Sequence, residues 1–315
     1  MTEHKIQTVA VVGCGTIGAS WALLFATRGL QVRLYDESAS ALDRAESFLD
    51  ESMAVLIKAG HLTPSEADQA RVRISRYQSL EDTLALADFV QESAFESYDV
   101  KRPLYRQLDA LSRQHVLLAS SSSGLLMSEI QAGLTHPERC LIAHPFNPPH
   151  LIPLVELVPG RQTHSETLER ARDFYLWLGK TPVMLRKEVS GHIVNRLAAA
   201  LWREAIDLAV EGVASVEDID LAVSAGPGLR WALMGQHLIY HLAGGPGGME
   251  AFLKHLQPAV ESWWQDLATW TEMPPEAPQV LIEGLNESLG NRSFKEITDW
   301  RDQALLRLVD TLKEP

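Results

Sequence analysis

The sequence predicts two domains, an α/β domain built on a doubly wound sheet and an all-α domain that follows it. Over the first part of the chain, strand-like apolar runs alternate with helical patterns, which is typical of a doubly wound sheet with parallel strand pairing in its first half. Past Ser190 and Gly191 the period-two alternation almost disappears and helical spacing takes over. A length of 315 residues also suits two domains better than one. We expect the first domain at residues 1–189 and the second at 190–315.

The first domain opens with a strand, a glycine-rich turn, a helix and a second strand. Residues 6–12 (IQTVAVV) form a β-branched run, GCGTIG follows at 13–18, and a helical pattern continues to Gly29, a residue type that favours helix ends. QVRLYD at 31–36 alternates as a strand does. Further helices are expected at 38–58, 64–70, 100–112, 164–179, 192–213 and 216–226, and further strands at 88–93, 115–123, 140–146, 154–160 and 181–186. Residues 71–77 are expected to form a strand or an extended segment.

Composition and charge exclude several classes of function. The net charge of -13 opposes binding to nucleic acid or to an anionic membrane surface, because both need a concentrated basic face. The two cysteines, Cys14 and Cys140, predict neither a disulfide framework nor a metal site. No stretch is apolar for long enough to span a membrane, and the polar start MTEHKIQ carries no secretory signal. We expect a cytoplasmic protein whose partner is a small molecule.

The glycine-rich turn predicts a dinucleotide site. In the pattern G-x-G-x-x-G the first glycine permits a tight turn, the second lets the backbone approach a pyrophosphate, and the third lets the helix pack closely on the strand. The pattern joins a predicted strand to a predicted helix, and an acid ends the next strand, which is the context of a Rossmann-type domain. That acid accepts hydrogen bonds from the adenosine ribose and repels a 2′-phosphate, so it favours NAD, although Arg33 tempers this preference. The expected NAD contacts are Gly13, Gly15, Thr16, Ile17, Gly18 and Asp36; the alternative is a glycine turn without a cofactor.

The stretch CLIAHPFNPPHLIPLVELVPG, residues 140–160, places two ionisable side chains in an apolar run. A dehydrogenase needs a base for the hydroxyl proton and a group that orients this base. Glu156 on one predicted strand could hold a ring nitrogen of His144 on the neighbouring strand and fix its tautomer. An isolated histidine in such a run is more often a core residue with its hydrogen bonds satisfied. Two polar groups on adjacent strands, however, can serve as hydrogen-bond partners for each other. We therefore expect a His144–Glu156 dyad.

Five segments that lie in both domains carry a resemblance to a known family: VVGCGTIGASWALLFATRGLQVRLYD, SSSSGLL, HPERCLIAHPFNPPHLIPLVELVPG, EVSGHIVNRLAAALWREAIDLAVEG and GPGLRWALMG. The sequence is similar to the L-3-hydroxyacyl-CoA dehydrogenase superfamily, within it to the branch of lambda-crystallin, also called L-gulonate 3-dehydrogenase, and also to L-carnitine 3-dehydrogenases. The resemblance implies an NAD-dependent dehydrogenase with His144 as catalytic histidine and Glu156 as its paired glutamate, and a homodimer formed through the C-terminal helical domain.

The resemblance assigns roles to four further residues. Ser123 in SSSSG falls where the family has a serine that hydrogen-bonds the substrate oxygen, and Asn195 in HIVNRL falls on the asparagine of the family's GF-I-x-NR motif. Glu96 and Lys101 match the pair that contacts the nicotinamide ribose side of NAD. Each has an ordinary alternative. Ser123 could end a strand, Asn195 could cap locally, and Glu96 could form an exposed ion pair with Lys101.

Departures from the acyl-CoA enzymes bear on the substrate. Gly124 replaces a usual second serine, His192 replaces an aromatic residue, and residues 37–75 lack the lysine-rich character of a surface that grips CoA phosphates. The resemblance and these departures together predict oxidation of the 3-hydroxyl of a small L-3-hydroxy acid, with L-gulonate as the first expectation. L-carnitine and a 3-hydroxyacyl-CoA are the alternatives. A non-catalytic, crystallin-like protein that keeps NAD affinity is an alternative from another class.

Arg230 and Trp231 in GLRWALMG are the candidate substrate contacts. A guanidinium can hold a carboxylate in bidentate fashion, and an indole can lie against an apolar surface or a quaternary ammonium group. The alternatives are an ion pair for Arg230 and ordinary packing for Trp231. Residues 238–252 resemble the carnitine branch, whereas NPPHLIPLVELVP resembles the lambda-crystallin branch, so these segments leave the substrate open.

Overall fold

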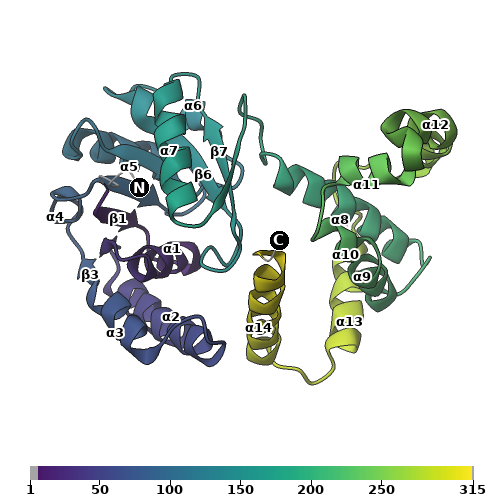
Figure 1. Ribbon diagram of the computed structural model, residues 1–315, viewed down its shortest axis with the longest axis horizontal. Helices are drawn as coiled ribbons and strands as arrows, with labels where there is room; N and C mark the ends of the chain where they lie inside the picture. The colour runs from purple at the N-terminus through teal and green to yellow at the C-terminus, as the bar shows by residue number, and fades with distance from the viewer. Residues whose placement is uncertain (1–5, 314–315) are drawn as a thin grey trace. The chain divides into compact units, whose positions relative to one another are not determined.

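The computed structural model describes residues 6–313, which form two compact units (Figure 1). The first unit runs as far as Asn195 and takes up the chain again at Thr298, whereas the second is Arg196–Ile297. The sequence predicts a single boundary, between residues 1–189 and 190–315. The division in the structure lies a few residues later, and the last helix belongs mainly to the first unit.

This last helix, α14 (Phe294–Lys313), returns to the first unit through specific contacts. Leu306 is buried in the apolar core of that unit. Asp310 forms an ion pair with His61, with 2.8 Å between Oδ2 and Nε2. Helical periodicity predicts the type of this element but not the surface against which it packs, which is why the sequence places it with the second domain.

A sheet of eight strands forms the centre of the first unit, in the order β3-β2-β1-β4-β5-β6-β7-β8. Neighbouring strands are parallel except for β6 and β7, which are antiparallel. This arrangement confirms the predicted doubly wound α/β fold. The strands are β1 (Thr8–Val12), β2 (Gln31–Tyr35), β3 (Ile74–Tyr77), β4 (Phe89–Glu92), β5 (Leu117–Ser120), β6 (Cys140–Pro145), β7 (Leu154–Pro159) and β8 (Thr181–Met184).

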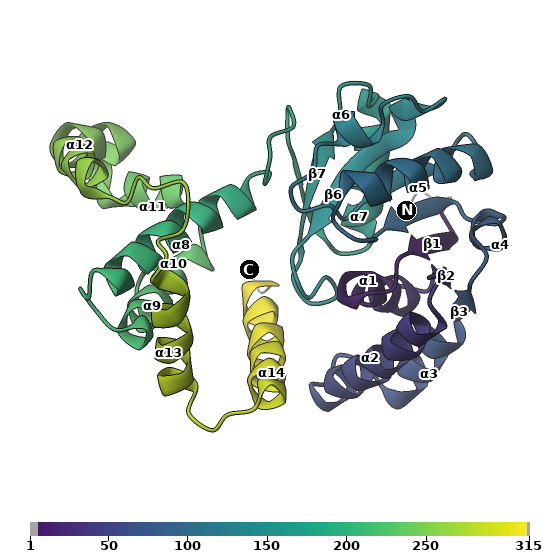
Figure 2. The same cartoon turned by 180° about the vertical axis from the view of Figure 1, so that it is seen from behind.

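Helices cover both faces of this sheet (Figures 1 and 2). In β1, Val9 and Val11 belong to the core beneath α1 and α7, whereas Ala10 and Val12 belong to the core beneath α5 and α6. Successive side chains of a strand point to opposite faces, so a continuous apolar run serves both cores. The helices of this unit are α1 (Thr16–Thr27), α2 (Ala39–Lys58), α3 (Pro64–Val72), α4 (Leu80–Leu84), α5 (Tyr98–Leu111), α6 (Met127–Ile130), η1 (Pro137–Arg139) and α7 (Ser165–Trp177), with α14 in addition.

β3 and β5 fall furthest short of their predicted spans, and each has a local cause. A capping box between Thr63 and Glu66 starts α3, which continues to Val72 and leaves only Ile74–Tyr77 for β3. β5 ends at Ser120, so the serines that follow leave the sheet and form a loop at its carboxyl edge. Ligands of doubly wound sheets bind at this edge, between the ends of neighbouring strands.

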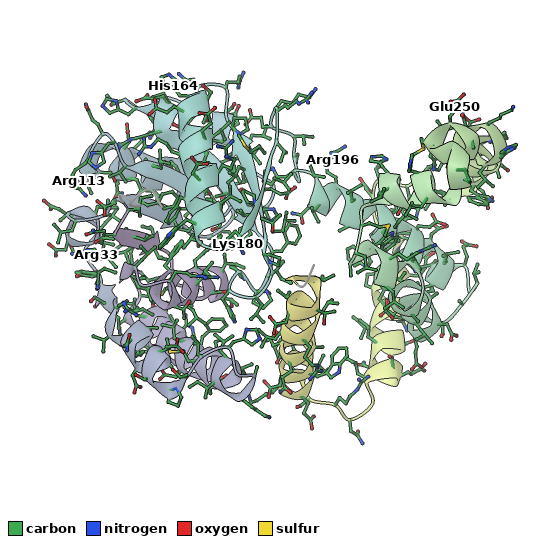
Figure 3. All side chains as sticks on the ribbon, in the orientation of Figure 1. Arg33, Arg113, His164, Lys180, Arg196 and Glu250 are labelled. Atoms are coloured by element: carbon green, nitrogen blue, oxygen red, sulfur yellow. The ribbon has the colours of Figure 1, made fainter. Side chains whose placement is uncertain are left out.

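Buried polar side chains bind the chain segment between β6 and β7. Lys180, labelled in Figure 3, donates from Nζ to the carbonyl oxygens of Pro149 and Ile152 at 2.8 and 2.5 Å. His150 is bonded through Nδ1 to the hydroxyl of Ser20 at 2.7 Å. Burial, together with the nearby charge of Lys180, lowers the pKa of His150 to about 4, so this ring is neutral at neutral pH. The connection is therefore fixed on the side away from solvent.

The regular elements of the second unit, Arg196–Ile297, are all helices, which confirms the predicted all-α region. Helix α8 (Val194–Val210) leads into it. Within residues 6–313, none of the helices combines the length and the hydropathy needed to cross a membrane. The other helices are α9 (Val216–Ala225), α10 (Pro227–Trp231), α11 (Gln236–Ala243), η2 (Gly245–Gly247), α12 (Gly248–Asp266) and α13 (Ala277–Leu289).

Candidate active site

His144 and Glu156 lie opposite each other on two strands of the sheet. They are paired in register on antiparallel β6 and β7, and both are buried. Nδ1 of His144 lies 2.8 Å from Oε2 of Glu156. Because an ionised carboxylate only accepts hydrogen bonds, Nδ1 carries the ring proton and Nε2 keeps a lone pair. The structure thus brings the two predicted residues together in the form that a general base needs.

The other carboxylate oxygen of Glu156 is held by the start of α8. The backbone N–H groups of Ile193 and Val194 donate to Oε1 at 2.9 and 3.1 Å. Burial alone raises the pKa of a carboxyl group, but the bonds from His144 and from these two amides lower the pKa of Glu156 below its ordinary value. Glu156 is therefore ionised at neutral pH and can stabilise the imidazolium that forms when His144 takes up a proton.

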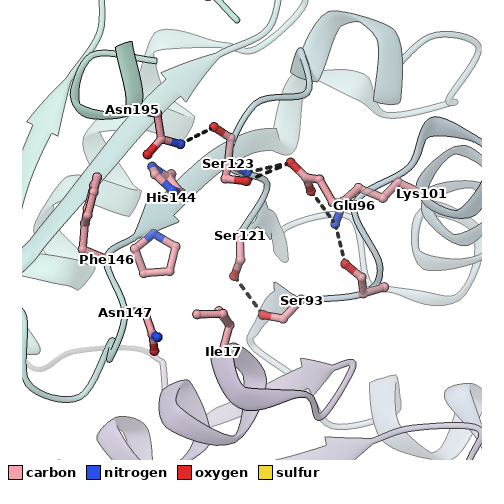
Figure 4. Close-up of a pocket in the computed structure, with 12 residues that line it drawn as sticks. Ile17, Ser93, Glu96, Lys101, Ser121, Ser123, His144, Phe146, Asn147 and Asn195 are labelled. Carbon is pink, nitrogen blue, oxygen red and sulfur yellow. Dashed lines mark hydrogen bonds and ion pairs between the residues drawn. The ribbon is translucent and has the colours of Figure 1, made fainter. Parts of the chain in front are cut away.

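Glu96 anchors the loop that follows β5 (Figure 4). Its Oε1 accepts hydrogen bonds from the hydroxyl of Ser122 at 2.7 Å and from the backbone N–H groups of Ser123 and Gly124 at 2.8 and 3.0 Å. Burial raises the pKa of Glu96, yet these bonds and a nearby lysine lower it overall. A single carboxylate thereby gathers the amides and the hydroxyl groups of the loop.

A cavity of about 470 Å³ brings three of the four predicted catalytic residues to one space (Figure 4). His144, Ser123 and Asn195 form part of its wall. Nδ2 of Asn195 donates to the carbonyl oxygen of Ser123 at 2.8 Å. This bond joins the loop that follows β5, residues 121–124 and called the serine loop below, to the beginning of α8. The remaining wall residues are Ile17, Ser93, Ala94, Glu96, Lys101, Ser121, Pro145, Phe146 and Asn147.

Phe146 and Asn147 are wall residues that sequence reasoning did not single out. The ring of Phe146 lies edge-on to His144, with 4.9 Å between the ring centroids. Both residues follow His144 directly, in the segment HPFNP, and this adjacency was the available signal. They place an aromatic ring beside the predicted base and an amide in the same cavity wall.

Ser121 and Ser93 were also missed, and a chain of hydrogen bonds explains their position. The hydroxyl of Tyr175 donates to Oε1 of Gln91 at 2.5 Å, and Nε2 of Gln91 and Nε1 of Trp21 donate to Ser121 at 2.9 and 3.2 Å. Both lone pairs of the Ser121 hydroxyl are then used, so Ser121 donates to Ser93, 2.8 Å away. The proton of Ser93 is left for an acceptor in the cavity. The four links join separate elements, so no spacing in the sequence indicates them.

Lys101 is buried, and its main partner differs from the expected one. Its side chain is 1% exposed, with Nζ 2.6 Å from Oε1 of Glu92 and 3.7 Å from Oε2 of Glu96. Nζ also donates to the carbonyl oxygen of Ala94 at 3.0 Å. The alternative of an exposed Glu96–Lys101 ion pair is therefore wrong. Both residues do reach the cavity wall, where contact with a nicotinamide ribose stays a prediction.

The glycine-rich turn has the shape that a dinucleotide requires. A Cβ atom at Gly13 would lie 2.8 Å from the carbonyl oxygen of Ser93, and one at Gly18 would overlap the carbonyl oxygen of Gly13. Nothing lies within 4 Å of such an atom at Gly15, so the space above this residue is open. Helix α1 begins at Thr16 without a side-chain cap or an acidic first turn, so its N–H groups are available to a pyrophosphate.

Asp36 completes this second site. A cavity of about 540 Å³ is lined by the glycine turn and by Asp36. The backbone N–H groups of Cys14 and Ser38 donate to its two carboxylate oxygens at 3.1 and 3.0 Å and so fix the orientation of the side chain. Arg33 donates from Nε to the carbonyl oxygen of Thr83 at 2.9 Å, so its guanidinium is engaged away from this carboxylate. The residues present fit NAD.

Arg230 and Trp231 lie on α10, which belongs to the second unit. Arg230 is exposed, and Nε1 of Trp231 donates to Oε1 of Gln236 at 2.7 Å. Their contact with a substrate stays a prediction. Among residues 6–313 there is also no group of three or more His, Cys, Asp or Glu side chains that could hold a metal ion.

Comparisons of the sequence with known proteins cover almost the whole chain. Residues 8–189 match the NAD binding domain of 3-hydroxyacyl-CoA dehydrogenase, and residues 191–280 match its C-terminal domain. An L-carnitine dehydrogenase of Nocardiopsis dassonvillei is 40% identical, over 99% of this chain and 94% of its own length. One of Pseudomonas aeruginosa is 41% identical, over 98% and 95%. A 3-hydroxyacyl-CoA dehydrogenase of Gibberella moniliformis is 42% identical, over 98% and 95%.

Solved structures agree with this assignment. An NAD⁺-dependent 5-formyl-3-hydroxy-2-methylpyridine 4-carboxylic acid 5-dehydrogenase is 30% identical and superposes with a TM-score of 0.82, over 98% of this chain and 99% of that chain. The 3-hydroxybutyryl-CoA dehydrogenase of Escherichia coli is 32% identical with a TM-score of 0.70, over 90% and 58%. The fold, the glycine turn with its acid and the full-length relatives lead to one conclusion: this chain belongs to the 3-hydroxyacyl-CoA dehydrogenase family and is an NAD-dependent dehydrogenase.

Proposed function

We propose that this dehydrogenase oxidises the 3-hydroxyl group of L-carnitine to a ketone. The observation that carries the proposal is the similarity to full-length relatives named L-carnitine dehydrogenase, which are 40%, 39% and 41% identical in three different bacteria. L-gulonate, the first expectation from the sequence, finds no support among these relatives. The evidence from relatives therefore favours the sequence-based alternative, L-carnitine, over the first expectation.

The dyad supports the proton transfer that this reaction needs. When bound, NAD supplies the acceptor for the hydride that leaves the carbon atom of the alcohol. His144 takes the hydroxyl proton at Nε2, since Nδ1 already holds the proton shared with Glu156. The carboxylate of Glu156 stabilises the imidazolium and keeps the ring in this orientation. General base catalysis of this kind contributes about 10²- to 10⁴-fold to the rate.

Ser123 and Asn195 support the orientation of the substrate. Both line the cavity together with His144, and Ser123 presents a hydroxyl group that can bond the reacting oxygen. Asn195 acts through the loop, because its amide donates to the carbonyl oxygen of Ser123. In this proposal Ser123 contacts the substrate, and Asn195 positions Ser123.

Phe146 and Glu96 support a cationic substrate. A quaternary ammonium group binds favourably over the face of an aromatic ring, and Phe146 offers such a ring in the wall beside His144. The side chain of Glu96 is 37% exposed and adds negative charge to the same wall. A trimethylammonium group close to these side chains would leave the 3-hydroxyl near His144.

A substrate screen tests the proposal. NADH absorbance is followed with L-carnitine, L-gulonate and L-3-hydroxybutyrate in the presence of NAD, and with acetoacetyl-CoA in the presence of NADH. We expect L-carnitine to have the highest kcat/KM, and we expect the variant His144→Gln to lose about 10²- to 10⁴-fold in kcat while it still binds NADH. Full turnover in this variant, or no turnover of L-carnitine by the native protein, would contradict the proposal.

A 3-hydroxyacyl-CoA is the second candidate substrate. The relative from Gibberella moniliformis, named 3-hydroxyacyl-CoA dehydrogenase and 42% identical, favours it specifically. In that case acetoacetyl-CoA would be reduced efficiently and L-carnitine would not be oxidised. The two outcomes are read from the same screen, which therefore separates the candidates.

The homodimer expected from the resemblance belongs to this proposal as well. The helical unit leaves large apolar side chains exposed, among them Leu197, Trp202, Trp263, Trp264 and Ile282. Such surfaces are usual where another protein chain covers them. Light scattering coupled to size exclusion is expected to give twice the mass of 34.9 kDa. A mass of one chain at micromolar concentration would contradict the dimer.

A further inference from the structure

His192 adopts a left-handed backbone conformation, which is unfavourable for a residue that has a side chain. Its φ is 51°, and among residues 6–313 it is the non-glycine residue with a positive φ. Gly191 directly before it has a φ of 73°. Residues with a Cβ atom are disfavoured in this left-handed region, which glycine adopts easily, and such residues cluster at functional sites. The presence of an imidazole at this position therefore suggests that the ring itself is used.

The ring of His192 is fully buried and makes one directed hydrogen bond. It is 0% exposed, and Nε2 lies 3.1 Å from the carbonyl oxygen of Ser122. A carbonyl oxygen only accepts, so Nε2 carries a proton, and the neutral form of this ring is then the tautomer with a lone pair on Nδ1. Burial, and to a smaller degree the neighbouring His144, lower the pKa of His192, which agrees with a neutral ring. In the described part of the chain Nδ1 is a buried acceptor without a partner.

The ring also lies against the predicted base. The centroids of the His144 and His192 rings are 5.3 Å apart, with an angle of 54° between the ring planes. The titratable groups that face His192 are His144 on β6 and Glu156 on β7. The next two residues, Ile193 and Val194, donate their N–H groups to Glu156. A short segment thus contacts the base, its carboxylate and the serine loop.

We propose that His192 is a positioning residue, whose neutral ring holds the carbonyl group of Ser122 against the His144–Glu156 dyad. Glu96 binds the hydroxyl and N–H groups on one side of the serine loop, and His192 binds a carbonyl group on the other side. With both anchors in place, Ser123 and His144 face the same reacting oxygen. This step rests on the roles assigned to Ser123 and His144 in the proposed function.

The alternative is that His192 only fills space, and the two accounts differ in what they require of the ring. A space-filling residue needs volume, and phenylalanine supplies it without a hydrogen-bond donor. A positioning residue needs the donor. Asparagine retains an N–H donor and tolerates the left-handed conformation, whereas leucine has a similar size and no donor. Glycine relieves the backbone and removes the side chain.

Kinetics of the variants His192→Phe, His192→Asn and His192→Gly test the proposal. Misplacement of a catalytic group by about 1 Å costs on the order of 10²-fold, so we expect kcat to fall about 10- to 100-fold in the phenylalanine and glycine variants. We expect the asparagine variant to stay within about 5-fold of the native value, and KM and the Kd for NADH to change by less than about 3-fold in all three. A native kcat in the phenylalanine or glycine variant would overturn the proposal.

A measurement without substrate separates this proposal from the proposed function. Hydrogen exchange of the peptide that contains Ser122 and Ser123 should become faster in the phenylalanine variant and stay near the native rate in the asparagine variant. Unchanged exchange in the phenylalanine variant refutes the anchoring role, whatever the substrate proves to be. If that variant does not fold, the pair His192→Asn and His192→Leu gives the same comparison. Turnover in His144→Gln would instead refute the assigned base and leave the exchange result standing.

Discussion

Glu156 joins the ring of His144 to the N-terminus of α8. One carboxylate oxygen lies 2.8 Å from Nδ1 of His144, and the other accepts the N–H groups of Ile193 and Val194 at 2.9 and 3.1 Å. The carboxylate is thereby fixed from two sides, and the base is fixed by the carboxylate. The position of His144 thus depends on a residue of β7 and on the start of a helix, not on its own strand alone.

The substitution Glu156→Gln is expected to remove the basic lone pair of His144 while it keeps the hydrogen bonds around position 156. The amide can accept the two backbone N–H groups with its oxygen, and it then presents an N–H group to Nδ1 of His144. Nδ1 must accept, so the proton moves to Nε2 and the lone pair that takes up the substrate proton is lost. We expect kcat to fall about 10²- to 10⁴-fold with little change in the Kd for NADH. A variant with native kcat would contradict this role.

The same substitution predicts a pH dependence of stability. In the folded chain the pKa of Glu156 lies below its ordinary value of 4.5. The ionised carboxylate therefore stabilises the fold at pH values above 4.5. The contribution is lost as the pH falls from about 4.5 through the lower pKa of the folded state. The difference in free energy of unfolding between the native protein and Glu156→Gln should therefore shrink on acidification. Urea unfolding at several pH values measures it, and a constant difference would contradict the prediction.

Asp36 is expected to determine the choice between NAD and NADP. Its carboxylate is oriented by Cys14 and Ser38 in the cavity beside the glycine turn, and it repels the 2′-phosphate of NADP. In Asp36→Ser we expect the ratio of kcat/KM for NAD to that for NADP to fall by roughly 10-fold or more, because a bidentate charged contact is worth about 1.5–3 kcal/mol. As a control, Asp43→Ser alters an acid on the neighbouring helix α2. An unchanged ratio in the first variant would refute the assignment.

The dyad could be predicted from the sequence because its signal is local. His144 and Glu156 are separated by one turn between two adjacent strands, and both are unusual in apolar runs. The glycine turn with Asp36 is likewise a local pattern with a known geometry. Residues that act through neighbours close in sequence, or through a fixed motif, are therefore accessible to prediction from the sequence alone.

The residues that hold the catalytic side chains in place could not be predicted from the sequence, because their hydrogen bonds join segments that lie far apart in it. The resemblance assigns Glu96 to the cofactor, which stays a prediction, but it gives no sign that Glu96 also holds the serine loop through Ser122, Ser123 and Gly124. His192 stands out in the sequence only as a departure from the family. Its contact with Ser122 spans two separate elements, and its left-handed backbone leaves no trace in composition or periodicity. Long-range contacts of this kind follow from the fold and not from spacing.

Lys101 provides a test of stability at the cofactor side of the site. It is buried with Glu92, and the hydroxyl of Ser120 also donates to this carboxylate at 2.6 Å. Lys101→Met leaves a buried carboxylate without its counter-charge, which costs about 3–5 kcal/mol. The double variant Glu92→Gln with Lys101→Met should be less destabilised, since no charge is left unpaired. Urea unfolding measures both, with the exposed Lys187→Met as control. Equal losses in Lys101→Met and Lys187→Met would contradict the prediction.

The buried Lys180 leads us to expect that the free energy of unfolding increases as the pH rises above about 7. Lys180 is 5% exposed, its Nζ donates to the carbonyl oxygens of Pro149 and Ile152, and burial lowers its pKa from 10.5 to about 7. Between these two values the unfolded chain binds a proton that the folded chain lacks, so the free energy of unfolding rises with pH across this window. The contribution levels off once the pH exceeds the ordinary value, where the lysine is neutral in both states.

Lys180→Met should abolish this rise. The variant also leaves the carbonyl groups of Pro149 and Ile152 without a donor, so we expect it to be less stable at every pH by about 1–3 kcal/mol. Urea unfolding between about pH 7 and pH 10 gives the two slopes, and the difference between variant and native protein cancels the titration of all other groups. Lys187→Met, which alters an exposed lysine, should keep the native slope. If the slopes of Lys180→Met and the native protein are parallel, then Lys180 is charged in the folded chain throughout this range, and the loop that carries Asn147 is held by an ammonium group and not by a neutral amine.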